Sequence, residues 1–313
     1  MAGCYQIKQF AAGSKLGKGG TGVTLGKWVP DVARIAPGLH FVATPIGAAR
    51  DITLRALDIL AGADVLAAED TRTLRHLMEI HGVALGGRMV VAYHDHNGEA
   101  VRPRLIAALK AGKSVAYASE AGTPLIADPG FQLARAAIAE GLAVLAAPGP
   151  SAVLCALTVS GLPTDRFMFA GFLPPKSAAR KAVLRDLAGV PGSVAFYESA
   201  RRIGAALRDM CEILGAERAA SVCRELTKRY EDVKRGTLGE LAEMFAGLEV
   251  KGEIVVVVDR GKMVEAGPDA VIGALQDAML TLSVKDAAAL VAGRLGMSKR
   301  EVYQVALGLA AAK

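Results

Sequence analysis

The chain has little cysteine and no long apolar run, and both scarcities exclude classes of protein. Its 313 residues include four cysteines without a C-x-x-C pair or a histidine at finger spacing, which excludes a disulfide scaffold and a zinc finger. We interpret the cysteines as reduced thiols. Apolar stretches such as residues 142–150 and 254–258 fall well short of the ~18 residues that a membrane helix needs. The N-terminal segment also lacks the apolar core of a secretory signal, so we expect a cytoplasmic protein with no membrane partner.

What the chain does contain is an ordinary globular composition. Hydrophobic residues make up 52% and charged residues 22%, which is typical of folded domains rather than of disordered or fibrous proteins. At about 150 residues per domain, this length indicates two domains with a small addition.

Positive charge is concentrated in two regions of a chain whose net charge is +6. Residues 1–37 hold five basic side chains against one acidic side chain, and residues 166–235 hold 14 against 8. A basic region is what a polyanion such as RNA would contact. A solvated helical surface of mixed charge would have the same composition, so both interpretations stay open here.

From residue 38 onward, short apolar runs alternate with helical periodicity. The alternation repeats five times before residue 150, which predicts a mostly parallel sheet covered on both faces. A cluster of Gly, Pro and Asp at residues 161–165 predicts a domain boundary, and a second α/β unit follows. The expected fold class is α/β, with two α/β domains and a small C-terminal helical unit.

The predicted parts are a disordered leader over residues 1–37, an α/β domain over 38–163, a second over 164–262 and a helical extension over 268–313. In the second domain we expect helices over 177–187 and 200–214 and a turn-rich stretch before residue 236. In the extension we expect helices over 284–295 and 299–309, which resemble a helix-turn-helix unit.

Two motifs lack the local structure that their usual binding sites require. Residues 17–22 match G-x-G-x-x-G, but neither a strand before it nor a helix after it is predicted, as a dinucleotide site requires. His94 and His96 flank Asp95 after a predicted strand. On an extended chain the two imidazoles point one way and the carboxylate the other, so we expect no metal site. We interpret the three as polar groups that line a ligand crevice.

Four loops at predicted strand ends carry small and polar residues: 44–47 (TPIG), 68–72 (AEDTR), 119–124 (SEAGTP) and 147–152 (APGPSA). Glycine allows close backbone approach, and the polar groups supply hydrogen bonds. Because ligands of such sheets bind outside the carboxyl ends of the strands, the four loops predict a small-molecule pocket at one edge.

Nine motifs follow one another in a recognisable order: TPIGAARDIT, AAEDTR, HDHN, SEAGTPLIADPG, APGPSA, LPTDRF, GFLPPK, FYES and CRELTK. In this order and spacing they resemble the tetrapyrrole methylase family, and within it the members that act on ribosomal RNA. The resemblance covers residues 38 to about 260 and, more loosely, the C-terminal helices. It implies S-adenosylmethionine bound in a cleft between two domains, and 2′-O-methylation of a cytidine ribose in 16S ribosomal RNA of the small ribosomal subunit.

The resemblance also implies site residues. The cofactor loops would contain Thr44, Pro45, Gly47, Ser119, Ala121, Gly122, Thr123, Pro148, Gly149 and Ser151. The sequence departs from the family pattern at Ala48, where Asn is usual, at Glu120, where Asp is usual, and in FYESARR, where Thr and His usually follow the serine. These departures change side chains but leave the loop backbone in place.

A ribose hydroxyl is a weak nucleophile, so a nearby base or acceptor would assist methyl transfer. Five side chains at or beside predicted strand ends are candidates, and the sequence does not rank them: Asp70, His94, Asp95, Glu198 and Glu225. Contacts to RNA phosphates are assigned to Arg72, Arg201, Arg202, Arg224 and Lys228. Ordinary surface salt bridges are the alternative role for these cations.

Two other functions stay open. A methylase of a tetrapyrrole or another small substrate would share the fold, and a non-catalytic RNA-binding relative would keep the fold without the chemistry. The basic stretch over residues 176–235 and the helical extension favour RNA, because a small molecule needs neither. The sequence leaves open whether the chain forms a homodimer.

Overall fold

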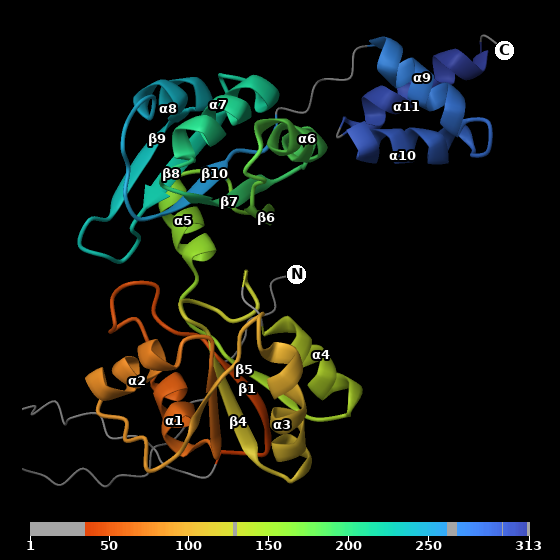
Figure 1. Cartoon of the computed structure of the whole chain (residues 1–313). Helices are drawn as coiled ribbons and strands as arrows, with labels where there is room; N and C mark the ends of the chain where they lie inside the picture. Colours follow the sequence, from red (N-terminus) through yellow and green to blue (C-terminus); the bar gives the residue numbers. More distant parts are fainter. Residues whose placement is uncertain (1–34, 128–129, 262–267, 296, 312–313) are drawn as a thin grey trace, which may run out of the picture.

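The computed structural model describes residues 35–127, 130–261, 268–295 and 297–311. They form two sheet-based domains and a helical unit that follows the second domain (Figure 1). The fold class predicted from the sequence is confirmed. The glycine motif at residues 17–22 lies outside the described residues.

The first domain is built on a parallel sheet with the strand order β3-β2-β4-β1-β5. Its strands are β1 (Gly38–Val42), β2 (Val65–Ala68), β3 (Val90–Ala92), β4 (Ser114–Ala118) and β5 (Val144–Ala147). These strands are apolar on both faces, so both faces must be covered. Helices α1 (Leu54–Gly62) and α2 (Thr71–Ile80) pack on one face, and α3 (Gly98–Lys110) and α4 (Phe131–Ala139) pack on the other.

The second domain is built on a mixed sheet with the strand order β6-β7-β10-β8-β9. Its strands are β6 (Phe167–Phe172), β7 (Ser193–Ser199), β8 (Ala219–Arg224), β9 (Asp232–Thr237) and β10 (Glu253–Val258). Helices α6 (Ser177–Leu187), α7 (Ile203–Leu214) and α8 (Leu238–Met244) cover one face, and α5 (Ala152–Ser160) covers the other. The chain therefore crosses between the domains in the loop between β5 and α5. The predicted domain boundaries themselves stay a prediction.

The structure corrects two predicted details of the second domain. The stretch before residue 236, expected to be turn-rich, has turns over residues 225–230, but its end from Asp232 onward forms strand β9, which pairs antiparallel with β8. The sequence does not predict this strand, because it carries charged residues such as Asp232 and Lys234, which pair with each other at 3.1 Å. An edge strand tolerates such charges on its solvent side. The helix expected from residue 200 begins at Ile203, after a turn.

The C-terminal unit contains the two predicted helices, α10 (Val284–Leu295) and α11 (Lys299–Ala311), preceded by α9 (Pro268–Ala278). Helix α9 lies within the predicted helical extension over residues 268–313, but no helix is predicted at its own residues. Proline fits the first turn of a helix, where its missing N–H is not needed. The unit has a core of its own, made by residues such as Leu275, Val291 and Val302. Among the described residues, no helix combines the length and apolar character that crossing a membrane requires.

Candidate functional site

Two loops at the carboxyl ends of β1 and β4 hydrogen-bond to each other. The N–H of Thr44 donates to the carbonyl of Gly122, and the N–H of Gly122 donates to the carbonyl of Thr44, both at 3.0 Å. Oγ of Ser119 donates to the Gly122 carbonyl at 2.6 Å. Thr44 and Ser119 are buried, so their side chains fix the loops from inside the domain.

The loop after β5 joins this edge of the sheet. Oγ1 of Thr123 donates to the carbonyl of Pro150 at 2.8 Å. A Cβ on Gly149 would lie 2.8 Å from the Cβ of Ala43, so glycine is required there by close packing against the end of β1. Gly122 has a φ of +80°, a conformation that other residues adopt only under strain. Both glycines thus shape the edge that three strand ends share.

The second domain contacts the same edge through the turn after β8. A Cβ on Gly47 would lie 2.5 Å from Cγ of Lys228 and 2.7 Å from Oγ1 of Thr227. The N–H of Ala48 donates to Oγ1 of Thr227 at 3.1 Å. Gly47 is therefore needed for the close approach of the two domains.

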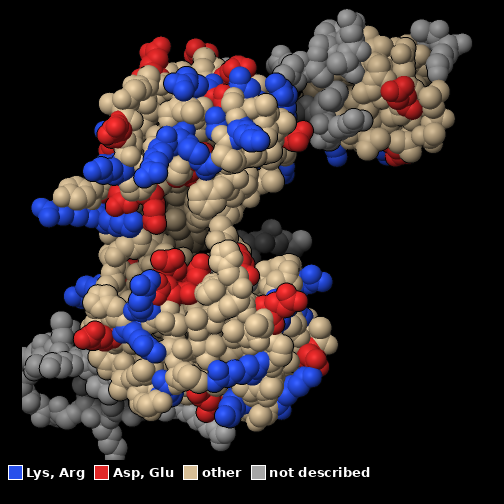
Figure 2. Space-filling view, viewed as in Figure 1, with Lys and Arg blue, Asp and Glu red and all other residues tan. Residues whose placement is uncertain are grey.

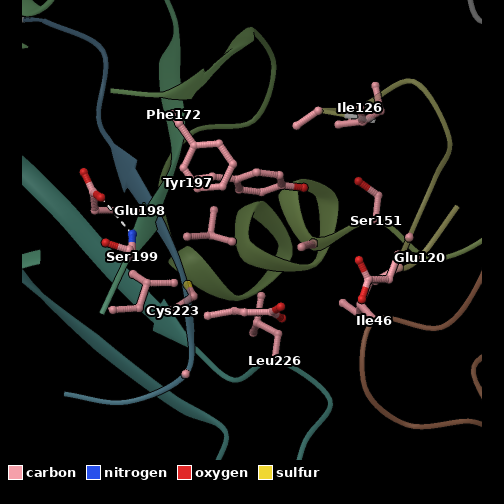
Figure 3. A pocket seen from close by; sticks show the side chains of 18 of the residues that line it. Ile46, Glu120, Ile126, Ser151, Phe172, Tyr197, Glu198, Ser199, Cys223 and Leu226 are labelled. Carbon is pink, nitrogen blue, oxygen red and sulfur yellow. Dashed lines mark hydrogen bonds between the residues drawn. The ribbon is translucent and has the colours of Figure 1, made fainter. Parts of the chain in front are cut away.

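A cavity of about 520 Å³ lies between the domains (Figure 3). The first domain contributes Ile46, Glu69, Glu120, Ala121, Gly122, Thr123 and Ile126, the loop into α5 contributes Ser151, and the second domain contributes Phe172, Tyr197, Ser199, Cys223, Leu226 and Glu253, among others. The volume lies in the range of small-molecule sites, about 300–1,000 Å³. Apolar walls with carboxylates on the rim suit a ligand that combines an apolar part with positive charge.

The ten predicted cofactor residues divide into two groups. Ala121, Gly122, Thr123 and Ser151 line the cavity. Thr44, Pro45, Gly47, Ser119, Pro148 and Gly149 are not among the lining residues. Individual contacts to a cofactor stay a prediction.

Asp70 and Arg72 are paired at the start of α2. Oδ1 of Asp70 accepts the N–H of Arg72 at 2.7 Å and the N–H of Thr73 at 3.3 Å, which makes Asp70 the N-cap of the helix. Oδ2 accepts Nη2 of Arg72 at 2.8 Å. The hydrogen bonds from Arg72 hold the pKa of the Asp70 carboxyl well below its usual range, and so strongly favoured a carboxylate is a weak base. Neither residue lines the cavity.

His94 and Asp95 lie in the turn between β3 and α3. The N–H of His94 donates to Oδ1 of Asn97 at 2.9 Å, and Asp95 is exposed. Strand β3 is at the end of the sheet, with β2 and β4 between it and β1, so neither residue lines the cavity. Within the described ranges, no group of three metal-ligating side chains is found.

Glu198 belongs to the cavity lining, but its carboxylate lies on the face of the sheet opposite α5. Side chains alternate along a strand, and Tyr197 packs with the α5 side whereas Phe196 packs with α6, α7 and α8. Glu198 therefore shares the Phe196 side. Figure 3 shows its carboxylate directed away from the middle of the cavity.

The buried carboxylate of Glu198 holds Arg202. Oε1 of Glu198 accepts the N–H of Ser199 at 2.7 Å and Nη2 of Arg202 at 2.6 Å. Nη1 of Arg202 in turn donates to the carbonyl of Leu173 at 3.4 Å. This geometry explains both residues as supports of the strand end and the neighbouring loop.

Glu225 and Lys228 pair within the second domain. Oε1 of Glu225 accepts the N–H of Glu253 at 2.9 Å and Nζ of Lys228 at 3.0 Å. The hydrogen bond from the Glu253 backbone lowers the pKa of the Glu225 carboxyl. Arg224 donates from Nη1 to the carbonyl of Lys251 at 3.4 Å. These groups stabilise the ends of β8 and β10. Neither Glu225, a candidate base, nor Lys228, a candidate phosphate contact, lines the cavity.

Charge is distributed unevenly around the cleft. Arg201 is exposed and follows the lining residues Ser199 and Ala200 in sequence. Figure 2 shows many lysines and arginines on the second domain, with some acidic residues among them, and acidic residues along the edge of the first domain that faces it. A polyanion would therefore contact the second domain in preference to the first.

Sequence reasoning does not predict the aromatic wall of the cavity. Phe172 and Tyr197 lie side by side, with ring centroids 5.5 Å apart, opposite Glu120 and Ser151 (Figure 3). Burial raises the pKa of the Tyr197 phenol, so it stays protonated. The alternation in residues 196–199 is the signal that could have assigned Tyr197, rather than Glu198, to the cavity.

The family of this chain is shown by its sequence, and the two-domain fold with a cleft agrees with it. The chain belongs to the tetrapyrrole (corrin/porphyrin) methylase family, whose model matches residues 38–242. The model of an RsmI C-terminal HTH domain matches residues 265–310, in agreement with the helix-turn-helix resemblance of the extension.

Relatives with a common name are similar over most of the chain. A protein named ribosomal RNA small subunit methyltransferase I from Mesorhizobium japonicum is 46% identical over 276 residues, which covers 88% of this chain and 93% of that protein. A protein of the same name from Mycobacterium tuberculosis is 44% identical and is covered over 93% of its length, with 85% of this chain aligned.

Solved structures with the same fold are more distant in sequence. The methyltransferase CobJ matches with a TM-score of 0.54 at 17% identity, over 72% of this chain and 95% of that one. A diphthine synthase matches with a TM-score of 0.53 at 18% identity, over 71% of this chain and 89% of that one. At these identities the likeness shows the fold alone.

Proposed function

We propose that this protein transfers a methyl group from S-adenosylmethionine to the 2′-hydroxyl of a cytidine in 16S ribosomal RNA of the small ribosomal subunit, in the cytoplasm. The observation that carries the proposal is the 46% identity to a ribosomal RNA small subunit methyltransferase across 93% of its length. The cavity between the domains and the basic second domain are consistent with it.

The cavity fits the proposed cofactor. When bound, S-adenosylmethionine supplies an electrophilic methyl group on a positively charged sulfur. Ala121, Gly122 and Thr123 on the wall of the first domain would hold it through backbone groups. Glu69 and Glu120, which line the same wall, are carboxylates that favour a cationic ligand.

The protein's contribution to the reaction is mainly the placement of the two reactants. Methyl transfer needs the attacking oxygen, the methyl carbon and the sulfur nearly in line, and holding them so supplies a large part of the rate. Of the five candidate bases, only Glu198 belongs to the lining. Its Oε1 accepts hydrogen bonds from Arg202 and Ser199, its Oε2 is buried without a hydrogen-bond partner among the described residues, and the carboxylate is directed away from the middle of the cavity (Figure 3). We therefore assign the larger part of the rate to positioning, with Glu198 as the one candidate base that the cavity retains.

The acceptor class is tested by offering labelled S-adenosylmethionine together with three acceptors in separate reactions. These are small ribosomal subunits that lack the modification, deproteinised 16S ribosomal RNA and a uroporphyrinogen. The proposal predicts label in the small subunits and none in the tetrapyrrole. Label in the tetrapyrrole alone would overturn it, and cofactor binding without transfer to any acceptor would indicate the non-catalytic relative.

A further inference from the structure

A large aromatic ring stands exposed at the cavity. Phe172, the last residue of β6, is 58% exposed although it lines the cavity. Its ring contacts Tyr197 edge to face, and Tyr197 contacts Phe169 in the same way at 4.7 Å between centroids. Exposure of a phenylalanine at a concave site leaves an apolar face for a ligand.

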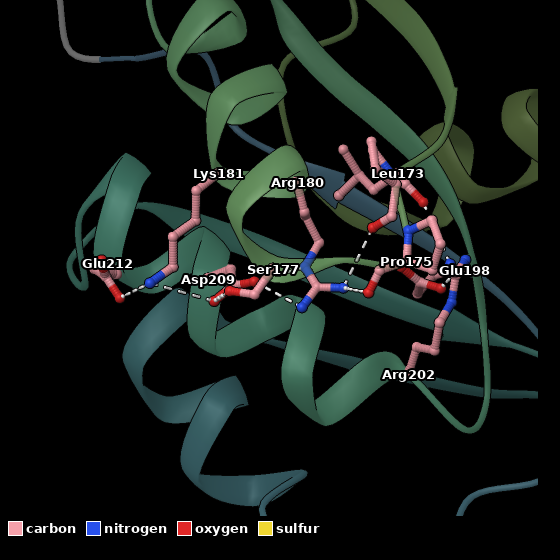
Figure 4. A network of polar contacts seen from close by, with 10 residues as sticks. Leu173, Pro175, Ser177, Arg180, Lys181, Glu198, Arg202, Asp209 and Glu212 are labelled. Carbon is pink, nitrogen blue, oxygen red and sulfur yellow. Dashed lines mark hydrogen bonds and ion pairs between the residues drawn. The ribbon is translucent and has the colours of Figure 1, made fainter.

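The backbone that presents this ring is held in place by two guanidinium groups (Figure 4). Arg202 donates to the carbonyl of Leu173 at 3.4 Å. Arg180 donates from Nη1 to the carbonyls of Pro174 at 3.4 Å and Pro175 at 3.3 Å. The two prolines also fix their own φ angles. The loop directly after Phe172 is therefore rigid.

The anchor Arg180 is itself deeply buried. It is 3% exposed, and its Nε and Nη2 donate to Oδ2 of Asp209 at 2.7 Å and 2.6 Å. Oδ1 of Asp209 accepts Oγ of Ser177 at 3.1 Å. The pair with Asp209 orients the Arg180 guanidinium so that its Nη1 reaches the carbonyls of Pro174 and Pro175.

The position of Phe172 indicates which flat group it receives. The loops that would hold the cofactor belong to the first domain, whereas Phe172 belongs to the second domain, where Arg201 is exposed beside the cavity. RNA phosphates would be attracted to that side and repelled by the acidic edge of the first domain. A base turned out of its stack exposes a π face that aromatic side chains bind.

We propose that Phe172, backed by Tyr197, is the platform on which the base of the target nucleotide stacks when that nucleotide enters the cavity. The inference rests on the proposed function, and it assigns the specificity for an unstacked RNA nucleotide to the wall of the second domain. Because the loop is rigid, the stacked base would set the position of its ribose hydroxyl relative to the first domain.

The test compares Phe172→Ala, Phe172→Leu and Phe172→Trp with the wild type in methyl transfer to small ribosomal subunits. Loss of a stacking partner costs about 5- to 150-fold, the equivalent of about 1–3 kcal/mol per base. We expect kcat/KM to fall by a factor in this range for Phe172→Ala and Phe172→Leu, and to stay within a few-fold of wild type for Phe172→Trp. Leucine is the sharper variant, because it keeps apolar volume and removes the flat face.

Two further measurements separate the alternatives. Phe167→Ala is the matched control, since Phe167 lies on the same strand, is 45% exposed and does not line the cavity; its kcat/KM should equal that of wild type. The affinity for S-adenosylhomocysteine, measured by calorimetry, should be unchanged in every variant. A parallel loss of that affinity in Phe172→Ala would place the cofactor's adenine on the ring and overturn the proposal.

The outcome also distinguishes this inference from the function on which it rests. If the wild type methylates small subunits and Phe172→Leu does so at the same kcat/KM, the stacking platform is refuted while the proposed function stands. If the wild type transfers no methyl group to small subunits, the proposed function fails and the inference falls with it.

Discussion

Gly122→Ala tests whether the loop after β4 holds the cofactor. Gly122 has a φ of +80°, and an added Cβ would lie 3.2 Å from Cγ2 of Ile46. An L-residue in this left-handed conformation costs about 1–2 kcal/mol. Relief of that strain requires the loop to move, which would disturb the paired backbone hydrogen bonds between Thr44 and Gly122, each worth about 1 kcal/mol.

Gly112→Ala is the control for backbone strain alone. Gly112 has a φ of +73° and nothing within 4 Å of its Cβ position, and it does not line the cavity. Both variants should lose about 1–2 kcal/mol of unfolding free energy, measured by urea titration with circular dichroism. Only Gly122→Ala should weaken binding of S-adenosylhomocysteine, by about tenfold, which equals about 1.4 kcal/mol. Equal, wild-type affinity in both variants would refute the placement of the cofactor on this loop.

Three other predictions concern the second domain and the extension. Because the pKa of the Glu225 carboxyl is lowered in the folded protein, its carboxylate stabilises the fold at pH values above the usual pKa of 4.5, and this contribution is lost as the pH falls through the folded pKa. The free energy of unfolding, measured by urea titration, should therefore fall less steeply between pH ~5 and pH ~3 for Glu225→Gln than for wild type. Parallel curves for the two proteins would contradict this. Arg201→Ala should reduce the slope of log RNA affinity against log salt by about 0.7–0.9 with unchanged cofactor affinity, and an unaltered slope would show that Arg201 does not contact phosphate. Deletion of residues 262–313 should leave the melting temperature of the sheet domains and the cofactor affinity unchanged, because the helical unit has its own core. Methylation of assembled small subunits should fall. A lower melting temperature of the truncated protein would show instead that the helices stabilise the second domain.

The alternation of strands and helices made most of the fold predictable. Continuous apolar runs such as β4 are buried on both faces, and a parallel sheet is the arrangement that permits this. The same pattern could not reveal β9, because an edge strand carries charged side chains on its open side. No helix is predicted at α9, because the charged residues, Gly267 and Pro268 that lead into it are typical of a linker.

The candidate site was predictable at the level of loops and not at the level of side chains. The loop containing Gly122 lines the cavity as expected, because strand ends of a parallel sheet meet at one edge. Gly47 and Gly149 are glycines for another reason, the approach of Lys228 and of Ala43, which depends on tertiary packing. To predict the orientation of the Glu198 side chain, one must know the register of β7 in the sheet. The presence of a carboxylate near a strand end does not give that register.

The most direct test of the proposed function is nucleoside analysis of the methylated product. Small ribosomal subunits that lack the modification are incubated with this protein and labelled S-adenosylmethionine, and the 16S ribosomal RNA is then digested and separated by chromatography with mass detection. The proposed function predicts label in 2′-O-methylcytidine, absent from a parallel reaction without the protein. Label on a base atom, on another nucleoside, or in no nucleoside while the cofactor binds normally would contradict it.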